Sequence, residues 1–109
     1  MSQREAEKQR ALKFEVGDRI KYITGRRYIL SLYEEAQGTI WQVSDFASYV
    51  RVLVCFDEDV GGGNFRHPET GVRSGRGRVM EFFSDVGNMG YDSTCNLYLL
   101  PKFKWIKMK

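Results

Sequence analysis

The arginines and glycines of residues 58–78 are the part of the sequence best suited to chemistry. Glycine lets a backbone approach a phosphate closely, and the planar guanidinium of arginine donates paired hydrogen bonds to phosphate oxygens. Flexible arginine–glycine loops bind nucleic acids mainly through the backbone, with an affinity that falls as salt rises. The alternative is a solvated surface loop whose arginines pair with Glu58, Asp59 and Glu69. The candidate nucleic-acid-binding residues of this segment are Arg66, His67, Arg73, Arg76 and Arg78.

A second candidate is the C-terminal tail, residues 102–109, in which lysines surround aromatic side chains. Lysine attracts phosphates and aromatic rings stack on bases, so this composition is typical of nucleic-acid contacts. The alternative is a final strand or short helix with its rings buried and its lysines in water. The loop and the tail would form one basic patch if they lay on the same face. The candidate binding residues of the tail are Lys102, Lys104, Trp105, Lys107 and Lys109.

The other polar clusters lack the spacing of a catalytic or metal site. His67 is the only histidine and Cys55 and Cys95 are the only cysteines, whereas a zinc site needs about four ligands. The glycines of residues 61–63 are not followed by the lysine and helix of a phosphate-binding loop, and residues 85–92 lack EF-hand spacing. We therefore expect a protein that is not an enzyme, with no catalytic residue, no metal and no cofactor.

Length and charge narrow the class of protein further. The chain has 109 residues, of which 42% are hydrophobic, and this is enough for one modest core. The net charge of +3 is unevenly distributed along the sequence. Residues 1–60 hold nine basic and ten acidic side chains, whereas residues 61–109 hold eight and four. The basic excess therefore coincides with the candidate binding segments, and we expect DNA or RNA as the partner.

Residues 1–13 are charged and nearly free of large apolar side chains, so the sequence shows no hydrophobic leader segment. No apolar stretch approaches the roughly 20 residues that a membrane-spanning helix needs. We therefore expect a soluble, cytoplasmic protein with no membrane partner, in which both cysteines stay reduced.

The first element expected to support the candidate loop is a strand over about residues 14–23. Its apolar side chains have one parity, so they point to one face of an extended chain. The Gly17-Asp18 pair predicts a turn or bulge that bends this strand without changing that face. The residues assigned to the face are Phe14, Val16, Ile20 and Tyr22.

Four further strands follow from hydrophobic patterning. The clearest is 49–57, in which valines and a phenylalanine alternate with a mixed face. The segment 28–35 fits a helix or a strand equally well. Near the N-terminus, Ser2 and Glu5 occupy capping-box positions, so residues 1–13 are either a short helix or a flexible arm. The other expected strands are 38–43, 78–83 and 97–100.

Four patterns follow one another along the chain, covering residues 14–57 and 97–101: Phe14-x-Val16-Gly17-Asp18-x-Ile20, Gly38-x-Ile40, Val52-x-Val54-x-Phe56-Asp57 and Leu99-Leu100-Pro101. This order resembles the SH3-like small β-barrels, of which the Tudor and KOW types are nearest. The chain departs from the KOW pattern by lacking its compact glycine-centred hairpin, and from Tudor domains by lacking a transferable set of cage aromatics. The resemblance implies a small barrel of a kind that usually binds nucleic acids or peptides and rarely catalyses.

The expected fold is therefore mainly β, with an SH3-like, five-stranded, strongly bent antiparallel barrel over residues 14–109. A helix or arm precedes it, and a long Gly/Arg-rich loop interrupts it. The expected function is non-enzymatic nucleic-acid binding through the loop and the tail. The alternative is a protein-interaction module, such as a small regulator or inhibitor that docks through exposed aromatics or an unpaired barrel edge.

Overall fold

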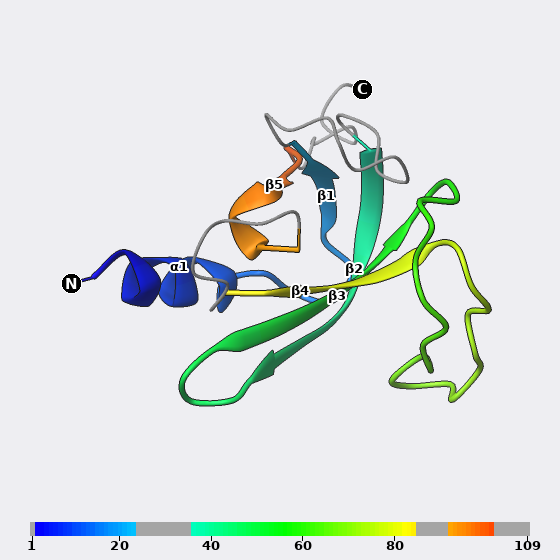
Figure 1. Cartoon of the computed structure of the whole chain (residues 1–109), viewed down its shortest axis with the longest axis horizontal. Coiled ribbons are helices and arrows are strands. Elements are labelled where there is room, and N and C mark those ends of the chain that lie inside the picture. Colours follow the sequence, from blue (N-terminus) through cyan, green and yellow to red (C-terminus); the bar gives the residue numbers. More distant parts are fainter. Residues whose placement is uncertain (1, 24–35, 85–91, 102–109) are drawn as a thin grey trace, which may run out of the picture.

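The computed structural model of the protein describes residues 2–23, 36–84 and 92–101 (Figure 1). The ambiguous segment 28–35 and the tail 102–109 lie outside the described residues. Within the described part, one helix precedes five strands and a short 3-10 turn. These elements are α1 (Gln3–Ala11), β1 (Arg19–Tyr22), β2 (Ala36–Asp45), β3 (Val50–Phe56), β4 (Val79–Phe83), η1 (Thr94–Asn96) and β5 (Leu97–Leu99).

All five strands form one antiparallel sheet in the order β4-β3-β2-β1-β5. The prediction of a mainly β fold with five strands is confirmed. The strands β4 and β5 lie at the two ends of this order, and no pairing joins them in the described part of the chain. The described strands therefore form an open sheet and not a closed barrel.

The core lies on one face of the sheet, and strand β3 defines it. The side chains of Val50, Val52 and Val54 are fully buried, as the alternation of this strand predicts. Phe82 of β4 brings its ring to 6.1 Å from that of Tyr22 and to the same distance from that of Phe56, measured between ring centroids. Aromatic and β-branched residues thus fill a core of the size that the composition allows.

The predicted strand over residues 14–23 is wrong in its first half. The strand begins only at Arg19, because residues 15–18 form a turn in which the Asp18 carboxylate accepts a hydrogen bond from the backbone N–H of Glu15 at 2.9 Å. Gly17 adopts a φ of +94°, which favours glycine. Val16 consequently points to solvent and is 61% exposed, while Phe14, Ile20 and Tyr22 are buried as predicted.

Strand β2 contains an extra residue. Ile40 is paired with Val54 and Gln42 with Leu53, so Trp41 has no partner in β3 and forms a β-bulge. We call the face opposite the core the outer face. The bulge lets both Ile40 and Val43 turn toward the core, and it leaves Trp41 beside the outer face.

The N-terminal segment is a helix and not a flexible arm. The Ser2 hydroxyl accepts a hydrogen bond from the backbone N–H of Glu5 at 3.1 Å, as the capping sequence predicts. The Arg10 guanidinium donates to the carbonyls of Thr94 and Leu97, and it lies 2.9 Å from the Glu7 carboxylate. Polar contacts with η1 and β5 therefore fasten a helix whose only fully buried side chain is that of Ala11.

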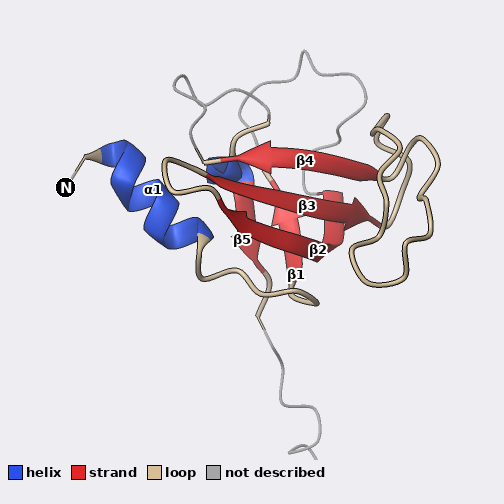
Figure 2. Cartoon of the chain, turned by 90° about the horizontal axis from the view of Figure 1, so that it is seen from below, coloured by secondary structure: helices blue, strands red, loops and turns tan. Residues whose placement is uncertain are grey.

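Figure 2 shows α1 at one end of the sheet and the long loop between β3 and β4 at the other. In the part of the chain that the structure describes, no helix is long and apolar enough to cross a membrane.

Candidate nucleic-acid interface

The loop between β3 and β4, residues 57–78, folds back on itself into a narrow ladder. Antiparallel bridges pair Gly62 with Gly77 and Arg66 with Arg73. The backbone N–H of Gly63 also donates to the carbonyl of Val79 at 2.9 Å, so the base of the ladder extends the sheet beside β4. The loop is therefore more regular than a freely solvated connection.

The glycines at the base of the loop allow backbones to approach each other. A Cβ atom at Gly62 would lie 2.2 Å from the carbonyl oxygen of Val79. Gly77 has a φ of +130°, and a Cβ there would lie 3.0 Å from the carboxylate of Asp59. These glycines are therefore explained by the folding of the loop itself, without a bound phosphate.

His67 organises the tip of the loop. Its Nδ1 atom accepts hydrogen bonds from the backbone N–H groups of Glu69 and Thr70, at 3.1 and 3.3 Å. Its ring meets that of Trp41 edge-on, with centroids 4.6 Å apart. The imidazole thus connects the tip of the loop to the bulge in β2, so His67 stabilises the loop.

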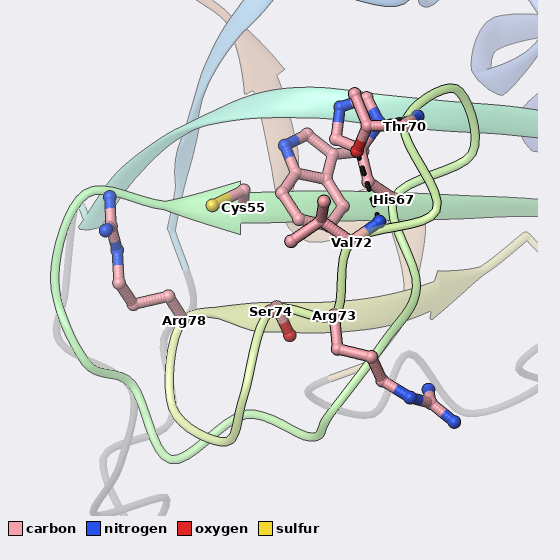
Figure 3. Close-up of a pocket in the computed structure, with 8 residues that line it drawn as sticks. Cys55, His67, Thr70, Val72, Arg73, Ser74 and Arg78 are labelled. Carbon is pink, nitrogen blue, oxygen red and sulfur yellow. Dashed lines mark hydrogen bonds between the residues drawn. The ribbon is translucent and has the colours of Figure 1, made fainter.

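A pocket of about 320 Å³ lies between the loop and the outer face of the sheet (Figure 3). Its apolar side chains come from the bulge, from β3 and from the loop tip, whereas its two arginines come from the loop. Figure 3 shows the guanidinium groups of Arg73 and Arg78 pointing in different directions, on either side of Ser74. The residues that line the pocket are Trp41, Cys55, His67, Thr70, Val72, Arg73, Ser74 and Arg78.

The guanidinium groups of Arg73, Arg76 and Arg78 are not neutralised by carboxylates of the described residues. Arg73 and Arg76 are exposed, and neither forms an ion pair with a carboxylate of the described residues. Arg78 donates from Nε to the carbonyl of Phe56 at 2.9 Å, which fixes its side chain without neutralising it. The expected alternative, in which these arginines pair with the carboxylates of residues 58, 59 and 69, is not what the described residues show.

Asp57, a carboxylate that interacts with Arg78, is already paired with Arg19. Asp57 receives two hydrogen bonds from the Arg19 guanidinium, at 2.9 and 2.6 Å. This pairing holds the pKa of Asp57 below its usual value, and the charge of Arg78 lowers it further. Asp57 therefore stays ionised near one side of the pocket, but its hydrogen-bonding capacity is directed toward Arg19.

Cys55 contributes an uncharged wall to the pocket. Burial raises the pKa of its thiol, so the neutral form predominates at pH 7 and the side chain behaves as a small apolar group. Cys95 is also a free thiol. Within the described ranges, no three histidine, cysteine or carboxylate side chains gather in a way that would hold a metal ion.

The structure brings together only some of the residues that the sequence nominates. His67, Arg73 and Arg78 line one pocket. Arg66 lies opposite Arg73 in the ladder and donates to the carbonyl of Gly71 at 3.2 Å, and Arg76 is on the same loop outside the pocket wall. The tail candidates Lys102, Lys104, Trp105, Lys107 and Lys109 lie outside the described residues.

Sequence reasoning missed the apolar wall of the pocket, above all Trp41. One signal was present: Ile40 and Val43 are both strand residues of a core type, but they are three positions apart. Two such residues share a face of a strand only when an extra residue stands between them. Cys55 and Val72 carry no comparable signal, because the loop reaches the sheet through contacts between residues distant in sequence.

Comparisons with protein-family models, with curated protein sequences and with solved structures gave no match to this chain.

Proposed function

We propose that this protein is a small, non-enzymatic, cytoplasmic domain that binds nucleic acid through the loop between β3 and β4. The observation that carries the proposal is a pair of arginines, Arg73 and Arg78, beside a pocket with an aromatic wall. Arginine recognises phosphate oxygens, and an aromatic side chain accepts a base by stacking. The lysines and the tryptophan of the tail remain part of the proposed binding surface.

We also propose that residues 14–109 form a single domain of the SH3-like small-barrel type. Five antiparallel strands that pack against one core support this interpretation. The long strand β2 pairs with β1 along its first half and with β3 along most of its length, so it links the two halves of a bent sheet. Barrels of this kind usually bind nucleic acids or peptides.

A salt titration tests the proposed function. Binding of fluorescent single-stranded and duplex DNA and RNA is measured by anisotropy at increasing salt. Each phosphate contact with a single strand adds about 0.7 to the slope of log affinity against log salt. Replacing Arg73 and Arg76 with alanine is therefore expected to reduce that slope by about 1.4.

The control removes the same number of charges at the opposite end of the sheet, in α1 and just after it, through Arg4→Ala with Lys13→Ala. Both side chains are exposed. Absence of binding to every probe at low salt would overturn the proposed function. An equal change of slope in the control variant would overturn the assignment to the loop.

A second candidate function is protein interaction, because aromatic side chains gather at the turn between β2 and β3. The Phe46 ring stacks on that of Tyr49 with centroids 5.2 Å apart, and Tyr49 lies 6.0 Å from Phe83. Phe46 is nevertheless 49% exposed. A stoichiometric protein partner that survives nuclease treatment, and that is lost on Phe46→Ser, would favour this function.

A further inference from the structure

The pocket has the character of a site for one flat, apolar group. Trp41 and Val72 offer apolar surface, and Cys55 is neutral at pH 7 because burial raises the pKa of its thiol. A volume of about 320 Å³ lies at the small end of the usual range for ligand sites. An aromatic wall with an opening to solvent suits a ring that enters from outside and lies against the indole.

The polar atoms of the pocket are largely used by the loop itself. The Ser74 hydroxyl accepts from the backbone N–H of Phe65 at 3.1 Å and donates to the carbonyl of Gly75 at 2.7 Å. The Thr70 hydroxyl accepts from the backbone N–H of Val72 at 3.2 Å. Few groups are left to read the hydrogen-bonding edge of a base, so recognition depends on stacking and charge and tolerates any sequence.

The two arginines that line the pocket distinguish a nucleotide in a chain from a free nucleotide. Their guanidinium groups point in different directions from opposite sides of Ser74 (Figure 3). A nucleotide within a strand carries a phosphate on its 5′ side and another on its 3′ side, whereas a free nucleoside monophosphate carries one. The Arg78 guanidinium lies on the Cys55 side of the pocket and that of Arg73 is directed outward from the loop, so the two cations match phosphates of successive nucleotides in a strand and not a single phosphate.

We propose that this pocket holds one unpaired base of a single-stranded nucleic acid, with the base against Trp41 and the flanking phosphates on Arg73 and Arg78. The inference rests on the proposed function and adds the class of nucleic acid to it. A duplex keeps its bases stacked and paired, so it contacts the arginines without filling the pocket.

The test compares three probes: an oligothymidylate of about ten nucleotides, a DNA duplex of similar length and free thymidine monophosphate. Affinities come from anisotropy and titration, and the indole N–H signal of Trp41, assigned through Trp41→Phe, is followed by NMR. We expect Trp41→Ala to weaken oligothymidylate binding about tenfold or more, with duplex binding nearly unchanged. Trp41→Phe retains most of the affinity because it retains a ring.

Two further variants keep the test independent of folding defects. Val72→Glu places a carboxylate beside the arginines at a position that is 65% exposed, so the fold tolerates it and single-strand binding falls. Phe46→Ala removes an exposed ring at the far turn and leaves every affinity unchanged.

The outcomes separate the two proposals. Equal affinity for single strand and duplex, with no effect of Trp41→Ala or Val72→Glu, overturns the pocket inference but leaves phosphate binding by the loop intact. Thymidine monophosphate that binds as tightly as the oligomer overturns the assignment to a strand. Absence of binding by every probe at low salt overturns both proposals.

Discussion

Replacing Arg10 with methionine is expected to release α1 from the sheet. Methionine keeps helix propensity and side-chain length but loses the donors that bind the carbonyls of Thr94 and Leu97. It also removes the cation that lies 5.5 Å from the centroid of the Phe14 ring. The Glu7 carboxylate, 12% exposed, keeps its 2.6 Å hydrogen bond from the Thr94 hydroxyl but loses its counter-charge.

The expected loss of stability follows from the two hydrogen bonds that Arg10 donates to carbonyl oxygens. A hydrogen bond from a charged donor contributes about 1.5–3 kcal/mol, and the lower end applies here because the Arg10 side chain is 36% exposed. Solvent screening reduces the sum further, so we expect a loss of about 2 kcal/mol in the free energy of unfolding. For a domain of this size that corresponds to a decrease of about 10 °C in Tm.

Chemical and thermal unfolding measure the global loss, and amide hydrogen exchange over residues 3–11 shows whether the helix opens by itself. Lys13→Met is the control, because it also replaces a cation with methionine, at an exposed position just after the same helix. It is expected to change the stability by no more than about 0.5 kcal/mol. A Tm of the Arg10→Met variant within about 1 °C of the wild type, together with unchanged exchange in α1, would refute the reasoning.

Three other substitutions probe the sheet and the loop. Gly62→Ala places a Cβ 2.2 Å from the backbone oxygen of Val79. Gly71→Ala meets no atom and costs only the strain of a φ of +74°, about 1 kcal/mol. Urea unfolding should therefore show a loss of stability several times larger for Gly62→Ala than for Gly71→Ala. Pairing with Arg19 lowers the pKa of Asp57, so the ion pair stabilises the fold above pH ~4, and this stabilisation is lost as pH falls through the lowered pKa. Asp57→Asn should therefore reduce the free energy of unfolding by up to about 1 kcal/mol at pH 7 and by almost nothing at pH ~2. A loss of stability that does not depend on pH would contradict this. Deleting Trp41 removes the extra residue and keeps the register on both sides of the bulge, whereas deleting Val43 turns Gln42 toward the core, so circular dichroism melts should show the first variant to be clearly more stable.

Strand β3 was predictable because the residues of the strand themselves determine its structure. Val50, Val52 and Val54 alternate with a mixed face, and a β-branched run of this kind has few other stable conformations in a small domain. The N-cap of α1 was indicated for the same reason, since Ser2 and Glu5 interact within one turn, although the sequence left a helix and a flexible arm open.

The turn at Gly17-Asp18 was predicted from those two residues, but the exposure of Val16 that results from it was not. The bulge at Trp41 was missed, although the spacing of Ile40 and Val43 indicated it. The Gly17 N–H donates to the carbonyl of Ile40 at 2.8 Å, so the first turn depends on a strand that comes much later. Val16 and Trp41 each departed from simple alternation. In the same way, residue type alone nominated Arg73 and Arg78, but only the three-dimensional contacts of the loop place them beside an aromatic wall.

The pairing of β1 with β5 has a consequence for the order of folding. Ile20 is paired with Leu99 and Tyr22 with Leu97, so well over half of the chain separates the partners. Closing so long a loop carries a large entropic cost, and contacts of this kind form slowly. Strands β2, β3 and β4 and the loop between them, by contrast, come from one continuous stretch of the described chain, residues 36–83. During synthesis the pocket can therefore assemble while one edge of β1 is still without its neighbour, and that edge is where a nascent chain would be most prone to pair wrongly.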